Sequence, residues 1–213
     1  VAGGILGAFA IAGVGLVVLT NTLTAERVAT NQREAMLSKF RAILPAEPVS
    51  GAPLMDNDPL QDRIQVSAPD LLGAPSTEVY RVRQAGQPVA VILTPVVPDG
   101  YSGPIRLLVS VKTDGTLGGV RVIEHHETPG LGDKIEERKT DWIKDQFDGK
   151  GLGQPGEERW LVKRDGGDFD QFTGATITPR SIVKAVKNSL KYVAREGAAL
   201  YDQPADATGK EAS

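Results

Sequence analysis

The chain has 213 residues, with 24 Lys and Arg against 27 Asp and Glu, so its formal net charge is −3 and no basic surface for a nucleic-acid partner is expected. It contains no cysteine, which excludes disulfides, cysteine-ligated iron–sulfur clusters and cysteine nucleophiles from this chain. A chain of this length accommodates one domain of about 150 residues with a sizeable core, together with an appendage.

The first predicted element is a membrane-spanning helix. Val1–Leu19 carries no charged residue and is close to the ~20 residues that a helix needs to cross a bilayer core. Gly3 and Gly7 give it a small face suited to close helix packing. A buried soluble helix is unusual at this length, and a cleaved signal peptide normally has an apolar region of only about 7–15 residues. We therefore predict a single uncleaved anchor in the lipid bilayer over residues 1–20.

A stalk and linker are predicted over residues 21–55. Apolar side chains recur between charged ones from Asn21 to Leu44, which is typical of an amphipathic helix, and Pro45 ends the pattern. The positive-inside rule gives no orientation, because the charges after the anchor are mixed in sign: Glu26, Arg27, Arg33 and Glu34.

Residues 56–200 are predicted to form one α+β domain, with an antiparallel or mixed sheet and flanking helices. Apolar or alternating runs predict strands at residues 78–83, 89–97, 105–112, 120–124 and 160–163. Asp114-Gly115 is typical of a two-residue hairpin turn between two of them.

Two helical regions complete the predicted domain. Residues 133–147 favour one or two helices, and a clearer amphipathic pattern covers residues 179–198. Thr178 is predicted as the N-cap of the second region and Pro179 as its first helical residue. Separate hairpins and helices favour an α+β arrangement over a doubly wound one. Residues 201–213 are small and polar, which predicts a disordered tail.

Three motifs suggest chemistry that the residues do not support. Gly151–Gly156 matches the dinucleotide pattern GxGxxG, but it contains Pro155 and precedes a predicted strand, so we interpret it as a surface loop. The only histidines, His125 and His126, are adjacent and would point to opposite faces of an extended chain, so no shared metal is expected. Asp165–Asp170 lacks the length and terminal Glu of a calcium loop. No metal site and no hydrolytic nucleophile set is predicted, so redox work would need a bound cofactor.

Two further segments each allow a structural and a functional interpretation. Glu127–Lys134 combines a proline turn with two glycines, so it is either a plain β-to-α connection or a loop whose backbone lies against a flat ring. Thr173–Thr178 is either the capped start of a helix or a helix N-terminus that binds a phosphate.

A resemblance to a known family bears on these segments. Thr-Gly-Ala-Thr at residues 173–176 resembles the flavinylation motif of the FMN-binding domain that occurs in the G-type subunit of Rnf ion-translocating oxidoreductases and in the C-type subunit of the sodium-pumping NADH:quinone oxidoreductase. Glu127–Gly132 resembles the second hallmark of that domain, and Gly100–Ile105 resembles the third. Residue 173 is Thr where Ser is commoner, a mild departure from the motif.

The resemblance implies a covalent cofactor. FMN would be joined through its phosphate to Thr176 as a phosphoester, installed by a separate flavin transferase that uses FAD. Asp168 or Asp170 would resemble the acidic element that the transferase reads, and Arg180 is either a cation for the phosphate or a solvated surface residue. The complete set of expected cofactor-binding residues is Thr173, Gly174, Ala175, Thr176, Thr128, Gly130, Leu131 and Gly132.

The resemblance also implies a place for the protein. We expect an electron carrier of an Rnf-type ferredoxin:NAD oxidoreductase coupled to Na⁺ or H⁺ translocation, with other membrane subunits as partners and no catalytic residue in this chain. The domain would lie on the periplasmic face of the bacterial inner membrane. The alternatives are the C-type subunit of the quinone reductase, a membrane-tethered FMN-binding sensor, and a structural protein of a membrane assembly.

Overall fold

A computed structural model describes residues 2–44 and 55–206, so the predicted linker around residues 45–54 and the end of the tail lie outside the described residues. The chain divides into two compact units, Val1–Arg41 and Ala42–Ser213.

The first unit is a single long helix, α1 (Ala2–Ala42, 41 residues). At ~1.5 Å per residue it is about twice as long as a ~30 Å bilayer core is thick. The described chain holds one candidate membrane span, the helical segment Phe9–Ala42, whose most apolar window has a mean hydropathy of 1.5 and no buried residue. Towards the end of the apolar run, Thr20 and Thr24 donate their hydroxyls to the carbonyls of Leu16 and Thr20, at 2.8 and 2.7 Å. These bonds satisfy the polar atoms within the helix, as an apolar surrounding requires.

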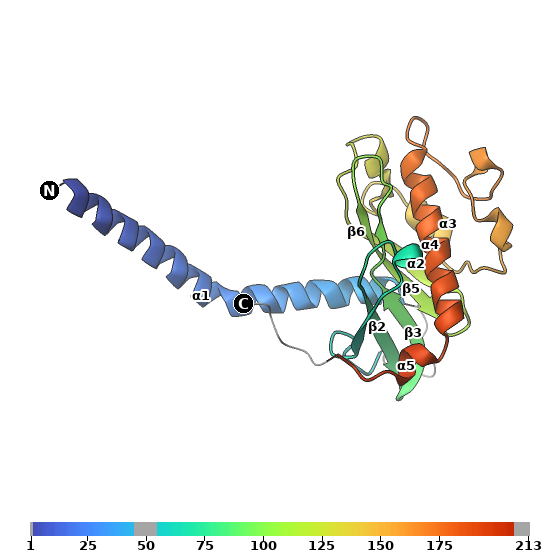
Figure 1. Cartoon of the computed structure of the whole chain (residues 1–213), viewed down its shortest axis with the longest axis horizontal. Helices are drawn as coiled ribbons and strands as arrows, with labels where there is room; N and C mark the ends of the chain where they lie inside the picture. Colours follow the sequence, from blue (N-terminus) through green and yellow to red (C-terminus); the bar gives the residue numbers. More distant parts are fainter. Residues whose placement is uncertain (1, 45–54, 207–213) are drawn as a thin grey trace. The chain divides into compact units, whose positions relative to one another are not determined.

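The second unit is built on an antiparallel sheet of six strands, seen with its helices in Figure 1. The strand order is β1-β2-β3-β5-β4, and β6 also pairs with β5. The strands are β1 (Arg63–Val66), β2 (Thr77–Gln84), β3 (Gln87–Leu93), β4 (Val96–Val97), β5 (Ile105–Lys112) and β6 (Leu117–Glu124). The predicted strands at residues 78–83, 105–112 and 120–124 are therefore confirmed. The predicted run 89–97 is divided between β3 and β4, because Thr94-Pro95 interrupts it.

The two long hairpins turn in different ways. Ala85 and Gly86 join β2 to β3 with φ of 50° and 72°, as a two-residue type I′ turn requires. The predicted two-residue turn at Asp114-Gly115 is wrong. Lys112 donates its N–H to the Thr116 carbonyl at 2.8 Å, which closes a three-residue loop with Gly115 alone at positive φ (81°). Asp114 instead accepts a hydrogen bond from the Thr116 amide at 2.8 Å.

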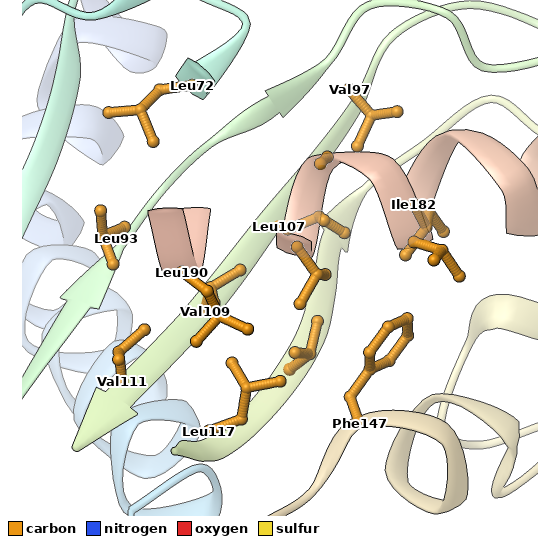
Figure 2. Packing of buried hydrophobic residues seen from close by; sticks show 14 of the residues in the cluster. Leu72, Leu93, Val97, Leu107, Val109, Val111, Leu117, Phe147, Ile182 and Leu190 are labelled. Carbon is orange, nitrogen blue, oxygen red and sulfur yellow. The ribbon is translucent and has the colours of Figure 1, made fainter. Parts of the chain in front are cut away.

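The main helix of this unit, α4 (Ile177–Glu196), packs on one face of the sheet and forms the core with it. Figure 2 shows Leu107, Val109 and Val111 of β5 beneath Ile182 and Leu190 of α4. Each of these side chains is at most 2% exposed, and burial of one such side chain contributes about 1.5–3 kcal/mol. The short helices α2 (Pro69–Leu72) and α5 (Ala199–Asp202) each contribute a buried leucine to the same core: Leu72 and Leu200.

Short helices and loops contribute a group of aromatic side chains to the same core. The short helices are η2 (Gly132–Ile135), α3 (Trp142–Phe147), η3 (Glu157–Arg159) and η4 (Lys163–Asp165). The predicted helical region 133–147 is thus two short helices. The predicted strand at residues 160–163 is wrong: Trp160 lies between η3 and η4, with its ring 4.7 Å from that of Phe169, and Val162 makes only one isolated bridge. Over only four residues, a strand and a loop that packs on the core have the same pattern of apolar side chains. Gly151–Gly156 is an irregular loop followed by η3.

Candidate functional site

One pocket brings together the three segments that carry the resemblance. It has a volume of about 120 Å³. Tyr101 comes from the loop before β5, a second set of residues from the loop after β6, and a third from the start of α4. The lining residues are Tyr101, Glu127, Thr128, Leu131, Gly132, Gly174, Ala175, Thr176, Ile177 and Thr178. Six of the eight predicted cofactor residues are among them, whereas Gly130 and Thr173 are not.

A tight turn delivers Ala175 and Thr176 to this pocket. Ala175 donates its N–H to the Phe172 carbonyl at 3.2 Å, and Gly174 has a φ of 82° at the third position of the turn. That position of a type II turn favours glycine, because a Cβ there is strained. Thr173 lies at the tip of the turn and is exposed.

Helix α4 begins earlier than the sequence pattern indicates. Its N-cap is Thr176 and its first residue is Ile177, so the prediction of Thr178 as N-cap and Pro179 as first residue is wrong. Proline is tolerated anywhere in the first turn, where its missing N–H has no intrahelical partner to lose, so Pro179 fits as the third residue. Thr176 has helical φ and ψ (−81° and −27°) and makes no side-chain cap. Its hydroxyl has no hydrogen-bond partner within the described part of the chain and lines the pocket.

Thr178 has a different role from the predicted cap. It is fully buried and donates its hydroxyl to Oε2 of Glu127 at 2.6 Å. The other oxygen of Glu127, Oε1, accepts the N–H of Ser102 at 3.1 Å. Glu127 is 5% exposed, and its carboxylate therefore joins the three pocket segments from inside. The sequence carries no signal for this contact, since 51 residues separate Glu127 from Thr178.

Two glycines leave room for this carboxylate. A Cβ on Gly132 would lie 2.3 Å from Oε2 of Glu127, and a Cβ on Gly100 would lie 3.1 Å from Oε1. The Gly100 Cβ would also lie 2.1 Å from the carbonyl oxygen of Gly103. Neither position has a positive φ, so glycine is required here by space rather than by backbone conformation.

The mouth of the pocket is apolar. Tyr101 is 66% exposed, and Leu131 and Ile177 are each 44% exposed. In the described part of the second unit, Leu161 is the one other large hydrophobic side chain that is exposed to this degree. Exposed apolar groups gathered at a pocket indicate a binding surface. Leu131 was predicted there from the sequence, whereas Tyr101 and Ile177 were missed because single exposed apolar residues carry no pattern.

The loop of the pocket is also held at its far end. Asp133 is 2% exposed and accepts the N–H of Gly130 at 2.8 Å, and Lys139 donates to its second oxygen. The Lys139 ammonium lowers the pKa of Asp133 below its usual range. Gly130 therefore supports the loop from behind the pocket.

The charged residues of the neighbouring loop pair with each other and do not line the pocket. Arg180 donates two hydrogen bonds to the Asp165 carboxylate at 2.6 and 2.8 Å, which lowers the pKa of Asp165. Arg180 is therefore engaged on the surface. Asp168 pairs with Arg159, and Asp170 pairs with Lys163.

Family models match both units of the chain. The FMN-binding domain model matches residues 100–191, a range that contains every residue lining the pocket. The model of the RnfG N-terminal region matches residues 2–43, which is the extent of α1 and one residue more.

Curated relatives cover nearly the whole chain. The chain is 50% identical over 189 residues to the G subunit of the ion-translocating oxidoreductase complex of Pseudomonas aeruginosa, which covers 88% of this chain and 85% of the relative. It is 41% identical over 206 residues to the G subunit of the same complex in Vibrio atlanticus, with 97% of this chain and 95% of the relative covered. The G subunit from Shewanella baltica is 41% identical over 203 residues, which cover 95% of this chain and 92% of the relative.

Proposed function

Because the chain belongs to the family of G subunits of ion-translocating oxidoreductase complexes, we propose that it is the membrane-anchored electron-transfer subunit of an Rnf-type complex, with FMN bound covalently at Thr176. The observation that carries the proposal is the pocket itself: a threonine hydroxyl without a partner among the described residues lies beside an apolar mouth at the start of a long helix. When bound, FMN supplies the redox chemistry that no side chain here provides.

The residues present fit this cofactor. The first-turn amides of Ile177 and Thr178 have no intrahelical partner and face the end of the helix dipole that favours a phosphate. Tyr101, Leu131 and Ile177 offer apolar surface for a flat ring. A pocket of about 120 Å³ is smaller than the ~300 Å³ at which pockets begin to enclose a whole ligand, which suits a carrier whose redox group must reach partners.

FAD is the flavin donor in the proposed attachment step. Thr176 Oγ forms a bond to the flavin-side phosphorus of FAD, the pyrophosphate P–O bond breaks, AMP leaves, and the hydroxyl proton passes to a base. An unactivated threonine hydroxyl is a poor nucleophile, and the described part of the pocket offers it no base within hydrogen-bonding distance. A separate flavin transferase is therefore part of the proposal.

The test is an intact-mass measurement on the full chain, co-expressed with a flavin transferase and purified in detergent. We expect the wild-type mass to rise by one FMN less one water, and Thr176→Ala to lose this increase. Thr128→Ala is the matched control, because Thr128 lines the same pocket and should keep the adduct. An adduct that persists in Thr176→Ala, or an unmodified wild-type chain, would contradict the proposal.

The orientation of the anchor and the partner subunits are also inferred from the family of G subunits. We propose that α1 holds the domain at the periplasmic face of the inner membrane, beside other subunits of a complex that couples electron transfer between ferredoxin and NAD to Na⁺ or H⁺ movement. The match to the RnfG N-terminal region favours the G-type subunit over the C-type subunit of the quinone reductase. Gentle solubilisation of native membranes should co-purify other membrane subunits, whereas isolation as a lone chain would favour a tethered sensor. An alkaline phosphatase fusion at the C-terminus tests the orientation.

A further inference from the structure

The buried charged side chain at the pocket has no ion-pair partner among the described residues, unlike the other buried charged side chains of the domain. Four charged side chains are buried in the described chain, and three of them have an ion-pair partner. Glu127 is the exception: among the described residues no cation pairs with it, although it is as buried as the others. The three compensated side chains are Arg81, which pairs with Asp62, Arg121, which pairs with Glu137 and Asp148, and Asp133, which pairs with Lys139.

Neutral donors hold the Glu127 carboxylate instead. One oxygen accepts the Ser102 amide at 3.1 Å and the other accepts the Thr178 hydroxyl at 2.6 Å. The Glu127 amide is fixed as well, because it donates to Nδ1 of His125 at 3.1 Å. Gly100 and Gly132 leave the space that the carboxylate occupies, so it has a single fitted position between the three segments.

We propose that Glu127 is a positioning residue with an electrostatic effect: it holds the three walls of the pocket together, and its uncompensated charge lowers the reduction potential of the flavin bound there. This inference rests on the proposed function for its second half only. The first half concerns the pocket of the chain without cofactor.

The direction of the electrostatic effect follows from Coulomb's law. A fixed negative charge that lines the pocket opposes the addition of an electron to a group in it, and the opposition is strong where water is excluded. Replacing Glu127 with Gln removes the charge. It keeps both hydrogen bonds, because the amide oxygen accepts from Ser102 and the amide nitrogen donates to the Thr178 hydroxyl, which is also an acceptor.

The decisive experiment is a spectroelectrochemical titration of the flavinylated full chain in detergent. We expect Glu127→Gln to keep the flavin adduct and to shift the midpoint potential upwards. The matched control is Asp133→Asn, which removes a similarly buried charge from the same loop. Asp133 does not line the pocket. The Lys139 ammonium that it leaves behind also pairs with Glu136 and is 37% exposed, so solvent screens it and the potential should remain close to wild type. Equal potentials for wild type and Glu127→Gln, or equal shifts in both variants, would overturn the electrostatic effect.

A second measurement tests the positioning role on protein expressed without the transferase. In Glu127→Leu, Ser102 and Thr178 lose their acceptor, so amide hydrogen exchange at residues 128–132 and 176–178 should become faster, whereas Glu127→Gln should exchange like wild type. Unchanged exchange in Glu127→Leu would overturn the positioning role. Hydrogen exchange tests the positioning role of Glu127 even if the wild-type chain never acquires FMN. The absence of FMN from the wild-type chain would contradict the proposed function alone.

Discussion

Two ends of the domain bury a charged side chain in opposite ways. Arg81, on β2, is 2% exposed and pairs with Asp62, and its guanidinium also donates to carbonyls of the C-terminal segment after α4, including that of Gln203. Glu127, at the pocket, is 5% exposed, and among the described residues its carboxylate accepts hydrogen bonds only from neutral donors, Ser102 and Thr178. The charge of Arg81 is neutralised within the fold, whereas the charge of Glu127 can act on a group bound in the pocket.

This difference separates a stabilising role from a functional one. A buried ion pair with both partners present is nearly neutral for stability, but removing one partner leaves a desolvated charge. A buried carboxylate held by neutral donors keeps its position without losing its field. We therefore expect substitutions at the Arg81 end to cause the larger losses in the free energy of unfolding. Substitutions at the Glu127 end should cause smaller losses and should also change the properties of the pocket.

The largest expected effect is at the Arg81 end. Asp62→Ala leaves Arg81 buried without its carboxylate, which should lower the free energy of unfolding by about 3 kcal/mol. Both tryptophans, Trp142 and Trp160, lie in the core of the second unit, so their fluorescence during urea unfolding of the full chain reports this domain.

A double variant tests whether the charge itself is responsible. Asp62→Ala combined with Arg81→Met removes the unpaired charge and should recover more than half of the loss. If the double variant is less stable than Asp62→Ala alone, the contacts of Arg81 with the C-terminal carbonyls matter more than its charge, and the comparison of the two ends fails.

A smaller effect is expected at the pocket. Thr178→Val removes one donor to Glu127 while keeping the shape of the side chain, which should cost about 1–3 kcal/mol through the unsatisfied carboxylate oxygen. Thr178→Ser retains the hydroxyl and loses one buried methyl group, so it should cost only about 0.8 kcal/mol. Urea unfolding of the full chain measures both variants. A similar loss in both would show that the methyl group of Thr178, rather than its hydrogen bond, is what the site needs.

The sequence predicted those parts of the molecule that depend on local patterns. The alternation in residues 78–83 and 105–112 and the uncharged N-terminal run are local features, and the strands and the long apolar helix follow them. The pocket segments were also recognised, because each is a contiguous motif. The contact that joins them was not predictable, since Glu127 and Thr178 are far apart in sequence and either could have faced solvent.

Errors of prediction occurred where a local signal has more than one structural outcome. Thr176 and Thr178 are both suitable N-cap residues, and the buried bond from Thr178 to Glu127 decides that the helix begins before Thr178. Asp114-Gly115 fits two-residue and three-residue hairpin loops alike, and the hydrogen bond from Lys112 to Thr116 selects the longer one.

The smallest expected effect is a pH dependence of stability that comes from Tyr201, close to Arg81 and Arg83. Burial raises the pKa of the Tyr201 hydroxyl to about 12, even though Arg83 and Arg81 nearby favour its ionised form. The folded-state pKa is higher than the unfolded value of about 10, so this tyrosine contributes stability that is fully present below about pH 10 and is lost as the pH rises towards 12. Tyr201→Phe has no hydroxyl to ionise, so its urea midpoint should fall less than that of wild type between pH 9 and 11. Parallel declines in the two proteins would mean that the Tyr201 hydroxyl has the same pKa in the folded and the unfolded chain, so that it is not desolvated at the Arg81 end.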